Sequence, residues 1–236
     1  MDVRRGERRN CIRSGEEDSA MANLITIGRL ALLFFVIWLL YVGNVQVITL
    51  CMVLIIVVFA SDGLDGWVAR RRGSTSTFGA VFDIAGDRVV ENALWIVFAD
   101  LDLLPIWVPL LVLTRGLIVD GLRSVSYADG MTAFGDNNMM RSPLTQWLTA
   151  GRFMRGLFGW AKAAGFVFLA GLEGDRHRDA SGTFLGWLYG QSLWIWFGWS
   201  LVVLSLALTI IRGIPVLIDS IAMVREIDQR RESRTT

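Results

Sequence analysis

The chain has 236 residues, of which 53% are hydrophobic and 19% are charged, and its formal net charge at pH 7 is +1. This near-neutral total conceals segregation, because arginines crowd the termini and certain loops while long stretches carry no charge. The composition and its patterning exclude an ordinary soluble domain and indicate a protein that crosses a membrane several times. The two cysteines, Cys11 and Cys51, provide no disulfide framework.

Six apolar stretches approach the length of about 20 residues that a transmembrane helix needs. We therefore predict an all-α integral membrane fold with six transmembrane helices between residues 21 and 212. The charged residues 1–20 lack an apolar segment, so we expect a disordered cytoplasmic arm and not a signal peptide. Residues 213–236 are expected to form a cytoplasmic C-terminal tail. The last span is the longest, and its first turns are expected in the headgroup region. The predicted spans are 26–42, 45–60, 78–98, 103–122, 156–172 and 184–211.

The distribution of arginines sets the expected orientation, because cytoplasmic loops of membrane proteins carry an excess of Lys and Arg. Arginines gather before the first span, after the second, between the fourth and fifth, and after the sixth. The alternate connections hold few of them. Both termini are therefore predicted to be cytoplasmic, N-in and C-in. The clusters are Arg4, Arg5, Arg8, Arg9 and Arg13; Arg70, Arg71 and Arg72; Arg123, Arg141, Arg152 and Arg155; and Arg212, Arg225, Arg230, Arg231 and Arg234.

The entry to the first span holds three polar residues at intervals of three, Asn23, Thr26 and Arg29. They match an N-x-x-T-x-x-R pattern, which leads into the first helix of a family named below. That family often has a proline ahead of the asparagine, where this chain has Ala22. An alternative interpretation is an interfacial helix whose arginine extends its charged end toward the headgroups.

Four aspartates between the second and third spans carry most of the functional information: Asp62, Asp65, Asp83 and Asp87. Ionisable groups in such a place are functional candidates by default. At about 4 Å and an effective dielectric constant of about 20, each like-charge contact costs roughly 4 kcal/mol. Two divalent cations would cancel four carboxylates, and hard oxygen ligands suit Mg²⁺ or Mn²⁺. We therefore predict a divalent-metal site here.

The spacing of these residues predicts how they meet. Asp62 and Asp65 are three residues apart and share one helix face. Gly79, Asp83 and Asp87 recur at intervals of four and form one stripe on the next helix. Two successive antiparallel helices can thus direct two carboxylates each into one cleft.

Small and cationic residues stand beside the first pair of carboxylates. Gly66 and Ala69 continue that side of the helix with almost no side chain, which leaves room for a ligand to approach the backbone. Arg70 closes the stretch and adds a fixed cation for a phosphate group.

Taken together, these residues fit the pattern D-x-x-D-G-x-x-A-R, eight further residues, and then G-x-x-x-D-x-x-x-D. This pattern resembles the signature of the CDP-alcohol phosphotransferase family. All of its fixed positions are met, by Asp62, Asp65, Gly66, Ala69, Arg70, Gly79, Asp83 and Asp87.

The resemblance implies a six-helix domain over residues 21–212, usually dimeric, with a polar cavity open to the cytoplasm. Members of the family displace CMP from a CDP-linked lipid or alcohol with the hydroxyl group of a second alcohol. It further implies that Asp87 is the general base toward that hydroxyl group. The implied ligands of a two-metal site holding Mg²⁺ or Mn²⁺ are Asp62, Asp65, Asp83 and Asp87. The implied contacts of the cytidine diphosphate group are Gly66, Ala69, Arg70 and Gly79.

The acceptor is indicated by a stretch at the end of the fourth span. Arg115 and Arg123 occupy both arginine positions of an R-E-x-x-x-x-x-x-R stretch that resembles bacterial phosphatidylglycerophosphate synthases, although Gly116 replaces the glutamate. Two arginines suit an acceptor that carries its own phosphate, such as glycerol 3-phosphate. Arg155 or Lys162 could complete a phosphate pocket. This resemblance implies a homodimer in the bacterial cytoplasmic membrane that acts on CDP-diacylglycerol and binds no nucleic acid.

Several alternatives remain open at this stage. Inositol phosphate is the main rival acceptor, and a free alcohol such as serine, or phosphatidylglycerol, would fit the same chemistry. A different class of protein is a cation carrier whose carboxylates line an ion path. Against a carrier, the aspartates cluster at one membrane face and no ladder of ionisable residues continues toward the other. A purely structural role, in which the aspartates only pair with arginines, would leave the spacing of the glycines to chance.

Overall fold

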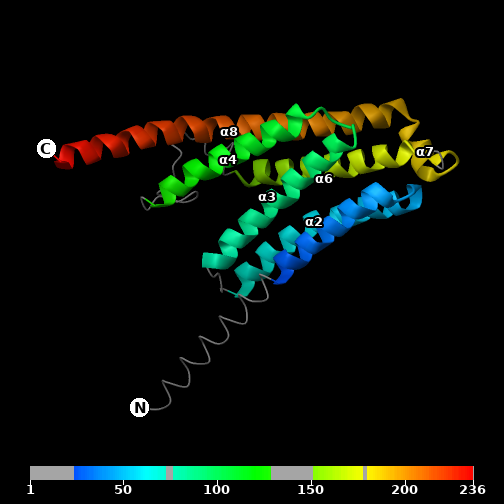
Figure 1. The fold of residues 1–236 in the computed structure, drawn as a ribbon, viewed down its shortest axis with the longest axis horizontal. Coiled ribbons are helices and arrows are strands. Elements are labelled where there is room, and N and C mark those ends of the chain that lie inside the picture. The colour runs from blue at the N-terminus through cyan, green and yellow to red at the C-terminus, as the bar shows by residue number, and fades with distance from the viewer. Residues whose placement is uncertain (1–23, 73–76, 129–150, 178–179, 236) are drawn as a thin grey trace, which may run out of the picture. The chain divides into compact units, whose positions relative to one another are not determined.

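The computed structural model describes residues 24–72, 77–128, 151–177 and 180–235, and within these ranges every regular element is a helix (Figure 1). The predicted arm at residues 1–20 lies outside the described residues. The all-α prediction is confirmed for the described part of the chain. The helices are Leu24–Val42, α2 (Val45–Arg72), α3 (Thr77–Asp100), α4 (Trp107–Ala128), α6 (Arg152–Asp175), α7 (Phe184–Tyr189) and α8 (Ser192–Thr235).

The chain divides into two compact units. The first comprises residues up to Leu104 together with Phe166–Ser192, and the second comprises Pro105–Gly165 together with Leu193–Thr236. Helix α6 contributes its second half to the first unit and its first half to the second. We describe each unit separately.

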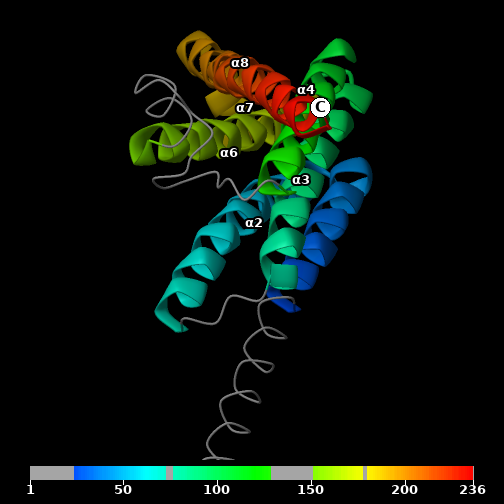
Figure 2. The same cartoon turned by 90° about the vertical axis from the view of Figure 1, so that its left-hand side faces the viewer.

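In the first unit, the helix Leu24–Val42 lies beside α3 and close to α2 (Figure 2). Apolar side chains at intervals of three and four residues turn toward the interior of the unit, which is the spacing of one helix face. At the centre, the ring of Phe166 lies 5.7 Å from Phe59, 4.7 Å from Trp95 and 5.9 Å from Phe98, measured between centroids. The buried apolar residues of the first two helices include Leu33, Val36, Leu40, Ile48, Cys51, Ile55 and Val58.

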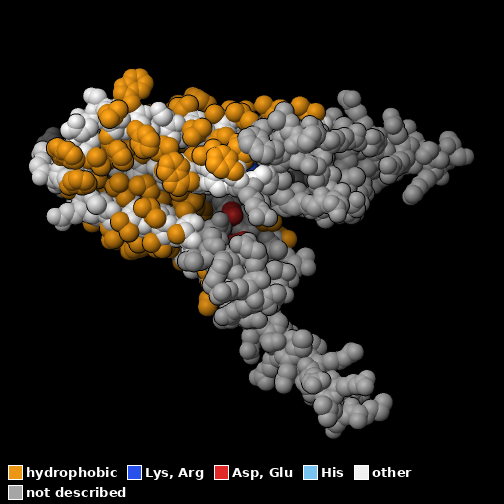
Figure 3. Space-filling view, turned by 180° about the vertical axis from the view of Figure 1, so that it is seen from behind, with side chains coloured by type: hydrophobic (Ala, Val, Ile, Leu, Met, Phe, Trp, Pro, Cys, Tyr) orange, Lys and Arg blue, Asp and Glu red, His pale blue; other side chains and the backbone are white. Residues whose placement is uncertain are grey.

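The outward faces of the helices are apolar as well, and orange side chains cover much of the described surface in Figure 3. Phe34, Trp38, Val53 and Ile56 are each about half exposed or more. A soluble protein rarely exposes such large contiguous apolar areas. These faces suit a hydrocarbon environment.

Two of the described helices are long and apolar enough to cross a membrane, Leu24–Val42 and Ser192–Ile214. Only 28% and 33% of their residues are buried, whereas the core helix of a soluble protein is mostly buried. A third apolar helical stretch, Val45–Ser61, is shorter. These helices support a membrane protein, while the six spans and the orientation of the termini stay predictions.

The prediction of one continuous helix over residues 184–211 was wrong. The structure divides it into the short helix α7 and the 44-residue helix α8, which begins at Ser192 and continues to Thr235. The chain leaves the α-helical pattern at Gly190, and the Gln191 N–H donates to the carbonyl of Leu188 over 3.1 Å.

Packing against α6 explains why α7 is separate. The hydroxyl group of Tyr189 is buried and donates a hydrogen bond to the carbonyl oxygen of Phe168 over 2.9 Å. The two rings also stack with centroids 5.6 Å apart. A Cβ atom added to Gly171 would collide with the Tyr189 hydroxyl, so only glycine leaves space for it. These contacts fix the direction of α7 independently of α8.

The connection between α3 and α4 is fastened by Arg176, which follows α6 in the same unit. Its Nη1 and Nη2 atoms donate to the carbonyl oxygens of Leu101 over 2.8 Å and Asp102 over 3.1 Å. Asp102 has a φ of 56°, a conformation that non-glycine residues seldom adopt. The guanidinium group therefore stabilises this backbone turn.

We predict that Arg176→Ala lowers the free energy of unfolding by about 1 kcal/mol, because two hydrogen bonds from a partly exposed charged donor are lost. Arg176→Lys should recover part of this loss, since an ammonium group can serve one of the two carbonyls. Thermal unfolding of the purified protein in detergent measures both variants. Equal unfolding temperatures for wild type and Arg176→Ala would contradict this role.

Candidate active site

The structure describes half of the predicted metal site. Asp83 and Asp87 lie one turn apart on α3, as their spacing predicts. Asp62 and Asp65 belong to α2, whose helix continues to Arg72, but their side chains lie outside the described residues. Gly66, Ala69 and Arg70 share this status, as do the side chains of Arg123 in α4 and Arg155 in α6.

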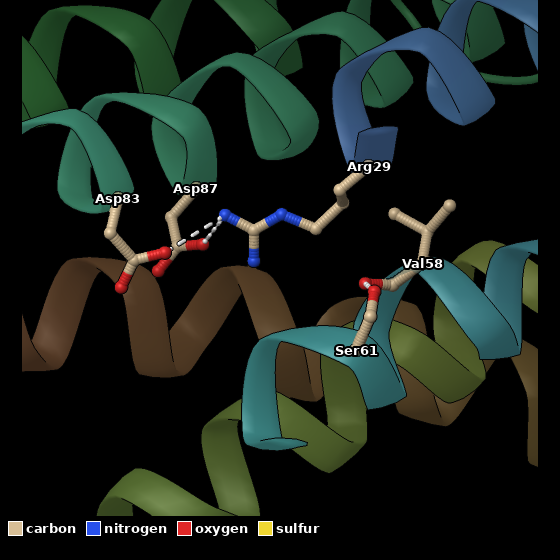
Figure 4. Close-up of polar contacts among 5 residues, drawn as sticks. All are labelled: Arg29, Val58, Ser61, Asp83 and Asp87. Atoms are coloured by element: carbon tan, nitrogen blue, oxygen red, sulfur yellow. Dashed lines mark hydrogen bonds and ion pairs between the residues drawn. The ribbon is translucent and has the colours of Figure 1, made fainter. Parts of the chain in front are cut away.

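The two described aspartates converge on Arg29, a residue of the helix Leu24–Val42 (Figure 4). Its Nη2 atom lies 2.8 Å from Oδ1 of Asp87 and 3.3 Å from Oδ1 of Asp83. The Arg29 side chain is only 2% exposed, whereas the Asp83 and Asp87 side chains are 41% and 47% exposed. A buried cation therefore bridges two half-exposed carboxylates, which is a strong form of hydrogen bond.

This convergence depends on the close approach of two helices. A Cβ atom added to Gly86 would lie 2.8 Å from Cγ2 of Thr26 and 3.1 Å from Nη2 of Arg29. Gly86 therefore gives Arg29 the room to reach Asp83 and Asp87 on either side of it. The sequence motif does not include Gly86, and we did not single it out from the sequence.

The carboxylate stripe of α3 continues beyond the motif. Glu91 is one turn after Asp87, is 5% exposed, and forms an ion pair with Arg88 over 3.5 Å. The sequence analysis missed this buried acid, although the interval of four from Asp83 through Asp87 extends to it. Gly79, which begins the stripe, is half-buried in α3.

On α2, Ser61 is the last residue before the motif, and it lies immediately before Asp62. The Ser61 hydroxyl donates to the carbonyl oxygen of Val58 within the same helix, over 2.9 Å (Figure 4). This bond satisfies the hydroxyl hydrogen within the helix itself.

The described residues supply two of the oxygen ligands that a divalent cation would need. The carboxylates of Asp83 and Asp87 are hard oxygen ligands, and both side chains are partly exposed. Among the described residues, no group of three or more His, Cys, Asp or Glu side chains could hold a metal ion. The contribution of Asp62 and Asp65 stays a prediction.

The second unit gathers basic side chains from three helices. Nζ of Lys162 lies 4.2 Å, and Cζ of Arg212 lies 5.0 Å, from the centroid of the Phe158 ring. A Cβ atom added to Gly213 would lie 2.8 Å from Nε of Arg115, so α8 packs directly on this arginine. We call Arg115, Lys162 and Arg212 the cationic cluster. Phe158 gave no signal in the sequence, and Arg212 was interpreted there only as a topology signal.

We predict that Gly86→Ala destabilises the protein by about 1–3 kcal/mol, because the added methyl group must displace Thr26 or Arg29. Alanine is otherwise the better helix former by about 1 kcal/mol. Gly28→Ala is the matched control, since a Cβ at Gly28 meets no atom within 4 Å. Thermal unfolding should therefore show opposite signs for the two variants. A neutral or stabilising Gly86→Ala would show that the two helices are not in close contact there.

Comparison with known proteins identifies a family to which this chain is similar. A family model described as CDP-alcohol phosphatidyltransferase matches residues 19–172, which is more than half of the chain. The match includes the helix that carries Arg29 and the whole motif from Asp62 to Asp87.

Individual relatives show the same similarity. The CDP-diacylglycerol–glycerol-3-phosphate 3-phosphatidyltransferase of Bacillus subtilis (strain 168) is 30% identical over 122 residues, covering 47% of this chain and 63% of that protein. The protein of the same name from Rickettsia prowazekii is 29% identical, covering 45% and 59%. The phosphatidylinositol phosphate synthase of Mycobacterium marinum is 32% identical, covering 39% and 41%. The chain thus spans less than two thirds of the length of these relatives.

Proposed function

The chain belongs to the CDP-alcohol phosphatidyltransferase family, and we propose that it transfers a phosphatidyl group from CDP-diacylglycerol to glycerol 3-phosphate. The products are phosphatidylglycerophosphate and CMP. The observation that carries this proposal is the convergence of Asp83 and Asp87, at their motif positions, on one cationic partner. The family assignment also favours an enzyme over the cation carrier.

In the proposed reaction, the acceptor hydroxyl oxygen attacks the phosphorus atom of the phosphatidyl group. The new ester P–O bond forms as the P–O bond to CMP breaks, and CMP leaves with that electron pair. Asp87 accepts the hydroxyl proton, because an alcohol is a poor nucleophile while protonated. Phosphoryl transfer otherwise depends mainly on positioning and electrostatics.

The four aspartates Asp62, Asp65, Asp83 and Asp87 would hold Mg²⁺ or Mn²⁺. Bound divalent ions supply charge neutralisation for the diphosphate and for the attacking and leaving oxygens. Arg70, Gly66, Ala69 and Gly79 are the proposed contacts of the cytidine diphosphate group.

The cationic cluster supports an acceptor that carries a phosphate group. Arg115, Lys162 and Arg212 bring positively charged side chains from three helices into one part of the second unit, and such side chains are common partners of phosphate groups. The names of the relatives from Bacillus and Rickettsia favour glycerol 3-phosphate. The Mycobacterium relative keeps inositol phosphate as the rival acceptor. Serine carries no phosphate group, and the phosphodiester of phosphatidylglycerol carries only one negative charge, so neither matches these basic side chains better than glycerol 3-phosphate.

The proposed setting is a bacterial cytoplasmic membrane. The chain would cross it six times with both termini inside, place its site toward the cytoplasm, and act as a homodimer. The apolar outer faces of the described helices support the membrane part of this proposal.

The direct test is CMP release from CDP-diacylglycerol in mixed micelles with Mg²⁺ or Mn²⁺ and one acceptor at a time. We expect release with glycerol 3-phosphate and little with glycerol, because only the first carries a phosphate. Inositol phosphate and inositol form the parallel pair. Release with an unphosphorylated alcohol alone would refute the proposed acceptor class.

We predict that Asp87→Asn reduces the rate of CMP release by at least about 100-fold, the low end of a general base's contribution. Asp100→Asn is the matched control on the same helix, since Asp100 lies outside the motif and accepts a hydrogen bond from Tyr41. It should keep near wild-type turnover. Turnover retained by Asp87→Asn would remove Asp87 as the base.

We predict that Arg115→Ala and Arg212→Ala each raise the KM for glycerol 3-phosphate by about 10-fold or more. Losing one charged hydrogen bond of about 1.5–3 kcal/mol gives a change of this size. The KM for CDP-diacylglycerol should change by less than about 2-fold. Arg176→Ala controls for the general loss of an arginine. Equal effects on both substrates would contradict a role in acceptor binding.

A further inference from the structure

Arg29 is not part of the aspartate motif, yet it makes the closest described contact with that motif's second half. One nitrogen atom, Nη2, lies within 3.3 Å of both Asp83 and Asp87. Figure 4 shows the guanidinium group reaching across from the helix Leu24–Val42, with the two carboxylates side by side on α3. An arginine that only anchored this helix at the headgroups would remain accessible, whereas this side chain is 2% exposed.

The charges explain why a buried arginine is tolerated here. Two carboxylates one turn apart repel each other, and a buried guanidinium group without a partner is strongly unfavourable. Each therefore compensates the other, and the pair of aspartates carries a formal charge of −1 once Arg29 is counted. A divalent ion that binds the same carboxylates has to do so in the presence of this fixed positive charge.

We propose that Arg29 is a positioning residue that acts as a built-in counter-ion for Asp83 and Asp87. It holds the two carboxylates together when no divalent ion is bound, and it weakens the binding of that ion, so that it sets the metal affinity of the site. The second half rests on the proposed metal-dependent function. The first half depends only on the described contacts.

The geometry requires arginine. Its planar guanidinium group stays charged and directs several N–H donors, so a single nitrogen can serve two acceptors while the rest of the group stays packed. Gly86 on α3 lies close to this nitrogen, and Thr26, from the helix of Arg29, lies close to the same glycine. A lysine would keep the charge without the fixed direction, and a methionine would keep much of the volume without the charge.

The test compares wild type, Arg29→Met and Arg29→Lys. Arg176→Met, from the same unit, is the control for Mn²⁺ affinity, which it should leave unchanged. Thermal unfolding in EDTA reports the metal-free state. The loss of the free Mn²⁺ signal in electron paramagnetic resonance reports the affinity for Mn²⁺. We expect Arg29→Met to unfold at least about 3 °C lower in EDTA. We expect it to bind Mn²⁺ at least about 5-fold more tightly, since a repelling charge is removed.

A merely structural role for Arg29 would give different results. Combined with Asp83→Asn and Asp87→Asn, the change Arg29→Met should lower the unfolding temperature in EDTA by clearly less than it does alone, or raise it. This follows because Arg29 then no longer pairs with these two carboxylates. Equal losses in both backgrounds would overturn the counter-ion role. Unchanged or weaker Mn²⁺ binding by Arg29→Met would overturn the effect on metal affinity.

Arg29→Lys keeps the proposal testable if Arg29→Met does not fold. It retains the positive charge, so its Mn²⁺ affinity should stay within about 3-fold of wild type. A tightening larger than that would refute the proposal. Wild-type CMP release, measured on the same preparation, separates the two ideas. CMP release by the wild type, together with no tighter Mn²⁺ binding by Arg29→Met, refutes only the role of Arg29. Tighter Mn²⁺ binding by Arg29→Met, together with no CMP release by the wild type, refutes only the proposed reaction.

Discussion

The ion pair between Arg29 and the carboxylates of Asp83 and Asp87 is the constraint on which the described half of the site depends. It joins two helices that are 54 residues apart in the chain at this contact, within a mostly apolar unit. The buried guanidinium group of Arg29 must be balanced locally, because solvent does not reach it. The close packing at Gly86 follows from this need, since the guanidinium group reaches both acids only where the helix backbones come near each other.

The same physical rule orders the rest of the molecule. The described helices present apolar side chains both to their neighbours and outward. The hydrophobic pattern therefore does not distinguish a face that packs inside the protein from one that faces outward. The polar and charged residues therefore carry the information. In the first unit they gather at Asp83, Asp87 and Arg29, and in the second they gather around Phe158. Both substrates of the proposed reaction are anionic: metal ions held by the aspartates would neutralise the diphosphate of the donor, and the basic side chains would bind the phosphate of the acceptor.

The sequence predicted the helices well, because long apolar runs are strong local signals; α3, for example, spans Thr77–Asp100 against a prediction of 78–98. It did not predict the break before α8, although Gly190, Gln191 and Ser192 interrupt the apolar run there. The direction of α7 depends on the distant contact between Tyr189 and Phe168. For the site, spacing placed Asp83 and Asp87 on one face. The partner of Arg29 could not be read from spacing, because that contact is set by how helices pack. Glu91 could have been found by extending the interval of four.

Helix α8 has a mechanical consequence of its own. A continuous helix of 44 residues is about 66 Å long, whereas the hydrocarbon core of a bilayer is about 30 Å thick. Its apolar portion, Ser192–Ile214, accounts for roughly the first half. If that portion is embedded, the remainder of α8 would extend beyond the lipid as a continuous helix. A partner that binds the far end would then change the tilt of the helix that carries Arg212.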